Sequence, residues 1–473
     1  MSNKNYDAIV IGSGPNGLAA AITLQRNGLS VLLIEGKNTV GGGMRTAEIT
    51  APGYQHDICS AVHPMAISSP FFKTIPFDQL GVQFIYPEID AAHPLDTGKA
   101  AILHHSIDRT ADSLGRDGKK YKSLISPLLE IWPEVIEDAL GPLHFPKKPI
   151  SMAKFGKLAI MPATFLANRF KTDEARGLWA GMAAHSIQPL SNIASSAIGL
   201  VLMTASHLYG WPIIKGGSQN MANALGAYFK TIGGRIETGN FIESIEQLPT
   251  SKAILLDLTP KQLLNLKDLR LSSSYTRQLQ HFRYGMGVFK MDWALNEPIA
   301  FKNQDCQKAG TVHLGSTFEE IATSELNTSR GINPTTPFVL LSQPTLYDKS
   351  RAPEGKHIAW AYCHVPNGST IDQTEIIENQ IERYAPGFKN TIIQRNTINA
   401  QQLELYNPNY VGGDINGGIL DIRQLYTRPV LSLSPYRTSA KGVYLCSSST
   451  PPGGGVHGMC GYHAALRCLK DLF

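Results

Sequence analysis

The amino-acid sequence predicts an α/β fold: a parallel, Rossmann-like sheet with helices, joined to a second, mixed or antiparallel sheet with a helical insertion. Residues 7–35 show the pattern of a buried strand, a glycine turn, a helix and a second strand, which is a βαβ unit. From about 75 to 205 longer helix-like segments replace this alternation, which resumes near 211. Between 283 and 365 strands follow one another with few helices, which is typical of an antiparallel sheet.

The N-terminal elements follow from residue pattern. Residues 7–11 are a short apolar run, as expected for a strand that is buried on both faces of a parallel sheet. A helix is predicted over 17–27 and a strand over 30–35. In the insertion a long helix is predicted over 121–140. The apolar run 193–205 is shorter than the ~18 to 20 residues that span a bilayer, so it predicts a buried helix.

The same reasoning continues to the C-terminus. Helices are predicted over 218–232 and 372–384, and a closing helix from about 461. The predicted strands are 235–245, 253–259, 283–295, 337–343, 356–365 and 442–447. The expected domain order is a first cofactor segment (1–70), a helical cap (71–206), a second cofactor segment (207–262), a substrate domain (263–419) and a third cofactor segment (420–473).

Composition limits the function. A chain of 473 residues can form two or three packed units. The net charge of +5, from 43 Lys and Arg against 38 Asp and Glu, is too dilute to indicate a nucleic-acid partner. The six cysteines show no CxxC spacing, so they are expected to be reduced core thiols, and no metal site is expected. The N-terminal residues resemble no export signal, so we expect a cytoplasmic protein.

The turn IGSGPNG (11–17) has the glycine spacing that holds a dinucleotide. Its glycines allow a tight turn, close approach of a pyrophosphate and helix–strand packing, while the helix N-terminus attracts the phosphates. Glu35, at the end of the second strand, is placed to accept hydrogen bonds from ribose hydroxyls. The residues expected at the dinucleotide are Gly12, Ser13, Gly14, Pro15, Asn16, Gly17, Glu35, Gly36 and Lys37.

A second glycine cluster, in GKNTVGGGMRTAE (36–48), indicates which dinucleotide is bound. It resembles the GG-x-x-R-x-(S/T) extension of the FAD-binding superfamily that includes phytoene desaturases and flavin amine oxidases. That resemblance implies FAD, with Gly42, Gly43, Met44 and Arg45 at its pyrophosphate and flavin side.

A third glycine turn, SSSTPPGGGVHGMCGYH (447–463), follows the last predicted strand. A helix N-terminus there can stabilise the negative charge that a flavin gains on reduction. With the run before it, this turn resembles the C-terminal signature of phytoene dehydrogenase-related FAD proteins, and best the branch named for pyridine nucleotide-disulfide oxidoreductase domain-containing protein 2. The resemblance implies further cofactor contacts from Ile242, Ser447, Ser448, Gly455, Val456, His457, Gly458 and Met459. Ser448 departs from the acidic residue of many relatives, which implies a weaker contact.

Disulfide reductase chemistry is excluded, because the chain has neither a second nucleotide turn for NAD(P)H nor a close cysteine pair. The catalytic candidates are Lys290, which resembles the lysine that flavin amine oxidases hold near the flavin, and His457, which could position substrate or transfer a proton. Solvent exposure or an ion pair with Asp292 would equally explain Lys290. His63 and His185 are candidates for the cavity wall, with packing as the alternative.

Three functions remain open. The first is an FAD-dependent dehydrogenase or desaturase of an apolar, isoprenoid- or lipid-like substrate, with residues 146–171 as a surface for anionic membranes. The second is a flavin amine oxidase, disfavoured because Gly458 replaces an aromatic residue of those enzymes. The third is an FAD-binding regulatory protein with little turnover. The sequence leaves substrate, electron acceptor and oligomeric state open.

Overall fold

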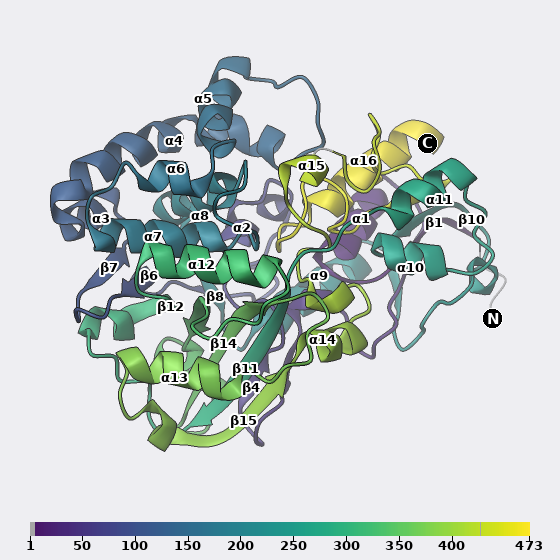
Figure 1. Cartoon of the computed structure of the whole chain (residues 1–473). Helices are drawn as coiled ribbons and strands as arrows, with labels where there is room; N and C mark the ends of the chain where they lie inside the picture. Colours follow the sequence, from purple (N-terminus) through teal and green to yellow (C-terminus); the bar gives the residue numbers. More distant parts are fainter. Residues whose placement is uncertain (1–4, 426) are drawn as a thin grey trace.

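The computed structural model describes residues 5–425 and 427–473 (Figure 1). Residues 1–4 and 426, which belong to the predicted cofactor segments 1–70 and 420–473, lie outside the described residues. Two sheets organise the described part, and helices cover both. This arrangement confirms the predicted α/β fold class.

The first sheet has five parallel strands in the order β16-β10-β1-β2-β9. Ala8 of the central strand lies opposite Val31 on one side and Ala253 on the other. Its apolar residues alternate between the two covered faces, which explains why the strand is apolar throughout. The strands are β1 (Tyr6–Ile11), β2 (Val31–Ile34), β9 (Arg235–Glu237), β10 (Ser251–Leu256) and β16 (Val443–Leu445).

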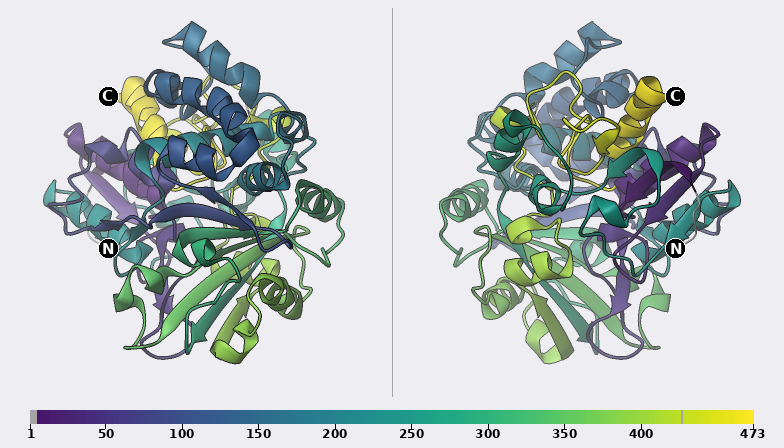
Figure 2. Two further views of the ribbon diagram at one scale, coloured as in Figure 1. Left: turned by 90° about the vertical axis from the view of Figure 1, so that its left-hand side faces the viewer. Right: turned by 90° about the vertical axis from the view of Figure 1, so that its right-hand side faces the viewer.

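Helices cover both faces of this sheet. On one face lie α1 (Pro15–Arg26), α9 (Ser218–Thr231) and α16 (Met459–Leu472), and on the other α10 (Pro260–Asn265) and α11 (Ser273–Gln280). The N-terminal α1 and the C-terminal α16 lie side by side (Figures 1 and 2). A Cβ atom on Gly461 would stand 1.7 Å from the Asn16 carbonyl oxygen, so this contact requires glycine.

The second sheet has seven strands in the order β15-β11-β14-β13-β12-β6-β7. All neighbours are antiparallel except β12 and β6, so the sheet is mixed, as predicted. The strands are β6 (Ile89–Pro94), β7 (Ala100–Leu103), β11 (Gly287–Leu295), β12 (Ala309–Leu314), β13 (Val339–Ser342), β14 (His357–Val365) and β15 (Ile392–Ile398). On the face away from the helical layer, the apolar side chains pack on α13 (Thr374–Tyr384).

Residues 71–206 form the helical layer over this sheet (Figure 2). Its helices are α3 (Ile107–Ser113), α4 (Gly118–Ala139), α5 (Pro149–Ala159), α6 (Ala163–Ala167), α7 (Asp173–Ala184) and α8 (Ser196–Tyr209). The predicted buried run 193–205 lies largely in α8. Because β6 and β7 come from the same segment, the predicted helical cap also supplies two strands of the second sheet.

One predicted strand is much shorter than expected. Residues 235–245 form a strand only as far as Glu237, because Gly239 adopts a positive φ of 70° and turns the chain. The Gly239 N–H then donates to the Lys37 carbonyl, and the Asn240 N–H to the Glu35 carbonyl. This turn carries Ile242 to the wall of the cavity described below.

Candidate functional site

A cavity of about 780 Å³ opens at the carboxyl ends of β1, β10 and β16 and extends to the second sheet. Ligands bind at this edge in open parallel α/β sheets. Its walls come from segments far apart in the chain, principally residues 11–65, 240–267, 405–417 and 447–456. The cavity therefore requires the complete fold.

The first glycine turn forms one wall of the cavity. From this turn Gly12, Ser13, Gly14, Pro15 and Asn16 line the cavity. The predicted contact Gly17 lies behind them, where a Cβ atom would stand 1.9 Å from the Gly12 carbonyl oxygen. Gly17 is thus required for packing within the turn rather than for a direct contact.

Glu35 joins the glycine turn to the second glycine cluster. Its carboxylate accepts the Ser13 N–H at 2.9 Å and the Lys37 N–H at 2.8 Å, and it pairs with Arg45 at 3.0 Å. Glu35, Gly36 and Lys37 all line the cavity. A carboxylate held in this way is oriented to accept hydrogen bonds from a ribose.

The second glycine cluster packs directly on the first turn. A Cβ atom on Gly42 would stand 2.7 Å from the Gly14 Cα atom, so the two backbones touch where a side chain would not fit. Gly42, Gly43 and Arg45 line the cavity, whereas Met44 is fully buried in the core.

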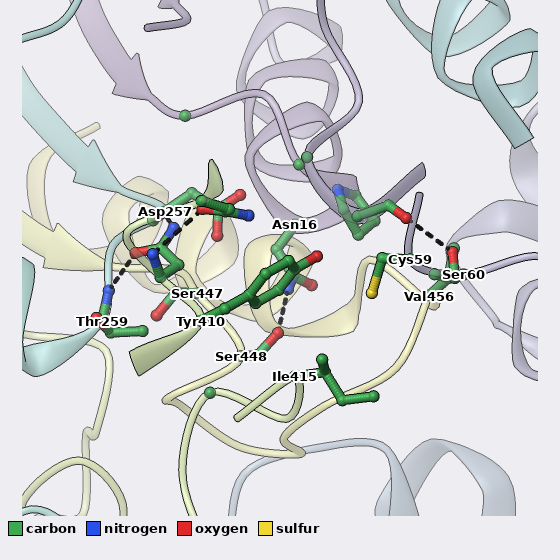
Figure 3. Close-up of a pocket in the computed structure, with 18 of the residues that line it drawn as sticks. Asn16, Cys59, Ser60, Asp257, Thr259, Tyr410, Ile415, Ser447, Ser448 and Val456 are labelled. Atoms are coloured by element: carbon green, nitrogen blue, oxygen red, sulfur yellow. Dashed lines mark hydrogen bonds between the residues drawn. The ribbon is translucent and has the colours of Figure 1, made fainter. Parts of the chain in front are cut away.

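The C-terminal turn closes the opposite side of the cavity, where Ser447, Ser448, Gly455 and Val456 line it. The Asn16 side-chain amide donates to the Ser448 hydroxyl at 3.3 Å and so joins the first and third glycine turns (Figure 3). Ser448, which departs from the acidic residue of relatives, therefore has a partner within the chain.

His457, Gly458 and Met459 lie behind this wall. The His457 Nδ1 accepts the Met459 N–H at 3.0 Å, so the donor predicted to face a flavin is already paired. Burial lowers the pKa of His457 to about 4. This neutral histidine caps the start of α16, and the geometry does not favour the predicted proton transfer.

Lys290 is buried on β11 behind Trp360, whose ring centroid lies 6.0 Å from the Lys290 Nζ. The Nζ atom lies 2.5 Å from both carboxylate oxygens of Asp292. The ion-pair alternative for Lys290 thus describes the structure, in which its ammonium group is neutralised outside the cavity lining.

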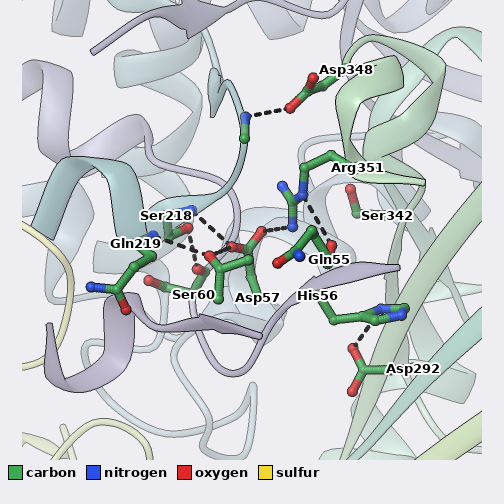
Figure 4. Close-up of polar contacts among 12 residues, drawn as sticks. Gln55, His56, Asp57, Ser60, Ser218, Gln219, Asp292, Ser342, Asp348 and Arg351 are labelled. Atoms are coloured by element: carbon green, nitrogen blue, oxygen red, sulfur yellow. Dashed lines mark hydrogen bonds and ion pairs between the residues drawn. The ribbon is translucent and has the colours of Figure 1, made fainter. Parts of the chain in front are cut away.

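A buried polar network holds the second glycine cluster in place (Figure 4). Asp57 accepts the Ser218 N–H at 2.8 Å and the Thr46 hydroxyl at 2.6 Å, and it pairs with Arg351 at 2.9 Å. Burial alone would raise the pKa of Asp57, but the Arg351 charge and these hydrogen bonds outweigh it and hold the pKa below its usual value. His56, the preceding residue, faces Asp292 at 3.5 Å.

The remainder of the cavity is a largely apolar chamber against the second sheet. His63 and His185 both line it, as the sequence suggested. Burial lowers the pKa of His63 to about 4 and that of His185 to about 3, so both are neutral. Sequence reasoning missed the other lining residues of the chamber, which include Ile187, Leu202, Trp211, Thr311, Leu340, Trp360 and Tyr362.

Sequence reasoning also missed Asp257, which directly follows β10. Its Oδ2 atom accepts the Gly17 N–H at 3.0 Å and would lie 2.8 Å from a Cβ atom on Gly14. Burial raises the pKa of Asp257 to about 7. A polar residue at the carboxyl end of a predicted parallel strand was the available signal.

Residues 10–73 match the family model described as an NAD(P)-binding Rossmann-like domain. The chain is 22% identical to pyridine nucleotide-disulfide oxidoreductase domain-containing protein 2 of Rattus norvegicus, over 99% of this chain and 94% of that protein. It is 21% identical to a polypeptide of the limonene dehydrogenase of Castellaniella defragrans, over 99% and 95%. With 4,4'-diapolycopen-4-al dehydrogenase of Metabacillus indicus the identity is 22%, over 94% and 93%. These relatives confirm the resemblance predicted from the sequence.

Solved structures show the same fold. An oxidoreductase from Methanosarcina mazei matches with a TM-score of 0.66 and 14% identity, over 99% of this chain and 100% of that one. A variant of putrescine oxidase matches with a TM-score of 0.63 and 15% identity, over 99% and 98%. The chain therefore shares its whole fold with these proteins.

The cavity fits a dinucleotide such as FAD. The first two glycine regions approach each other where a Cβ atom would block them. The Asn16 Oδ1 atom is buried without a partner among the described residues, beside the pyrophosphate-binding turn. Both features are typical of a site that holds a ligand with its backbone.

Proposed function

We propose that this chain is an FAD-dependent oxidoreductase, a dehydrogenase or desaturase that removes hydride from an apolar substrate. The observation that carries this proposal is that one continuous cavity joins the three glycine regions to the apolar chamber on the second sheet. Bound FAD would supply a flavin ring that accepts hydride. The relatives named as limonene and diapolycopenal dehydrogenases support this interpretation.

The chain's own residues would bind and orient. The glycine turn and Glu35 would hold the adenosine and pyrophosphate part, with Ile242 beside the adenine. Gly43, Ser448 and Val456 lie towards the chamber, where the flavin would meet the substrate. Apolar walls exclude water, and this favours hydride transfer over side reactions.

The test is the visible spectrum of the purified protein, followed by anaerobic titration with polyenes, long-chain lipids and amines. We expect flavin bands near ~370 and ~450 nm that bleach with an apolar substrate. A colourless protein that takes up no added FAD would refute the cofactor. Bands that no substrate bleaches would instead support the regulatory alternative.

A flavin amine oxidase is the second candidate, since the fold is shared with putrescine oxidase. In that case Lys290→Met should slow flavin reduction by amines at least tenfold. Asp292 must then be replaced by Asn in the same protein, because Lys290→Met alone leaves a buried carboxylate without its partner. Amine turnover that equals the parent's would exclude a role for Lys290.

We further propose that residues 146–171 contact an anionic lipid surface. This segment projects from the molecule as α5 and α6 (Figures 1 and 2). It exposes Ile150, Ile160 and Phe165 beside exposed lysines such as Lys154 and Lys157, a pattern typical of interfacial helices. Among the described residues no helix is both long and apolar enough to cross a bilayer.

Vesicle co-sedimentation tests this contact. The protein should bind vesicles that contain anionic lipid and not zwitterionic ones, and Ile150→Asp with Phe165→Asp should abolish binding. Ile332→Asp, at an equally exposed site on another surface, is the matched control. Binding by the double variant would refute the contact.

A further inference from the structure

The chamber carries polar groups that its apolar character does not explain. The helical-layer face of the second sheet presents one row of directly paired residues, His313, Leu340 and Tyr362, and Trp360 lies two residues from Tyr362 on the same face. Thr311 shares this face with His313. Leu340, Trp360, Tyr362 and Thr311 line the cavity, so this face of the sheet is a wall of the substrate chamber.

Several polar atoms of this wall have no hydrogen-bond partner among the described residues. Trp360 Nε1 and Thr311 Oγ1 are buried and unpaired. Tyr362 is partly exposed to the cavity, and its hydroxyl has no partner within the described ranges either. An unpaired buried polar group is costly, so a wall that contains several indicates that a ligand satisfies them.

His185 adds a fourth polar group from the opposite side of the chamber. Its Nε2 lies 3.0 Å from the Nε2 of His313, so one of the two neutral rings donates to the other. The His313 Nδ1 is buried without a partner, which is less costly for a lone pair than for an N–H. We therefore assign the shared proton to His313, which leaves the His185 Nδ1 as a donor.

The wall thus offers donors and no charge. A tryptophan N–H only donates, and the tyrosine, threonine and histidine groups donate as well. The charged residues that line the cavity all lie at its dinucleotide end: Glu35, Lys37, Arg45, Glu243, Asp257 and Lys267. An ammonium ion would find no carboxylate in the chamber, and a hydrocarbon would leave every donor unpaired.

We propose that the chamber selects apolar molecules that carry a carbonyl oxygen, which is received by Tyr362 and His185, with Trp360 and Thr311 in the same wall. This substrate class refines the proposed function and rests on it. Neutral donors suit a carbonyl because its oxygen accepts two hydrogen bonds and brings no charge into the chamber.

The test compares three ten-carbon probes on the FAD-loaded protein: 2-decanone, decane and decylamine. Equilibrium dialysis measures their binding to the parent, Tyr362→Phe and Trp360→Phe. Each substitution keeps an aromatic ring and removes one donor, so it should weaken 2-decanone binding by about tenfold and leave decane binding unchanged. Tyr275→Phe is the matched control, because Tyr275 also has a buried, unpaired hydroxyl but lies outside the cavity lining.

Equal loss of 2-decanone and decane, or no loss of either, would overturn the proposal, as would a stronger dependence of decylamine on these donors. Thr311→Val and His185→Phe provide independent variants should one of the first pair misfold, as judged by thermal unfolding. A protein that takes up no FAD would refute the proposed function, although probe binding could still be measured. A flavoprotein that oxidises hydrocarbons and binds 2-decanone no differently in the variants would refute only the substrate class.

Discussion

Replacing Asp257 with asparagine tests how the nucleotide turn is balanced against an acidic neighbour. The Asp257 carboxyl accepts the Gly17 N–H at 3.0 Å, and an asparagine carbonyl oxygen can accept the same bond. The substitution thus keeps the shape and removes the titrating proton. Any pH-dependent difference between the two proteins then reports the ionisation of Asp257.

The magnitude follows from the pKa. Burial, opposed by the Gly17 hydrogen bond and assisted by the charge of Glu35, raises the pKa of Asp257 from 3.8 to about 7. Between these values the unfolded chain loses its proton and the folded chain keeps it, so the native protein loses stability as the pH rises from about 4 to 7. At about 1.4 kcal/mol per pKa unit, the loss approaches roughly 4 kcal/mol.

Urea unfolding of the FAD-free proteins, followed by circular dichroism, measures this loss. Relative to its value at pH 4, the stability of Asp257→Asn should gain up to roughly 4 kcal/mol over the parent by pH 8. The variant should also bind FAD more tightly at pH 8, as measured by quenching of FAD fluorescence, because an ionised carboxylate beside the turn repels phosphate. A stability difference that does not change with pH would refute the reasoning.

Two further substitutions test packing and the polar network. Gly461→Ala should destabilise by about 2 kcal/mol or more in urea unfolding, since its Cβ atom would stand 1.7 Å from the Asn16 carbonyl oxygen. Gly156→Ala, with no atom within 4 Å of its Cβ position, should instead stabilise by up to about 1 kcal/mol, and equal effects of the two would contradict this packing argument. Arg351→Met should cost roughly 3–5 kcal/mol at pH 7 because it leaves Asp57 buried and unpaired. Since the pKa of Asp57 is lowered in the native protein, this cost should shrink as the pH falls towards 4, and a constant cost would be inconsistent with the pair.

The cofactor half of the site could be predicted because its signals are local. The spacing of Gly12, Gly14 and Gly17 and the strand that ends at Glu35 report backbone geometry that only a short segment determines. Gly17 illustrates the limit of such a pattern. Its glycine is required, but for contact with Gly12 rather than with a ligand.

The chamber could not be predicted because its residues meet only through sheet pairing. Thr311, Leu340 and Trp360 lie on three different strands, and no local pattern shows that they share a wall. The strand β6 was missed for a related reason. Its sequence, IDAAHP, contains residues that strands rarely favour, yet tertiary packing buries all of them.

The hydrogen bond between Asn16 and Ser448 joins residues that are 432 positions apart in the chain. During synthesis at roughly 5 to 20 residues per second, the first turn waits about 20 to 90 s for its partner to leave the ribosome. Until β16 emerges, β10 is an unpaired edge of the parallel sheet. The cofactor cavity is thus completed only at the end of synthesis, and the nascent chain carries an exposed strand edge in the meantime.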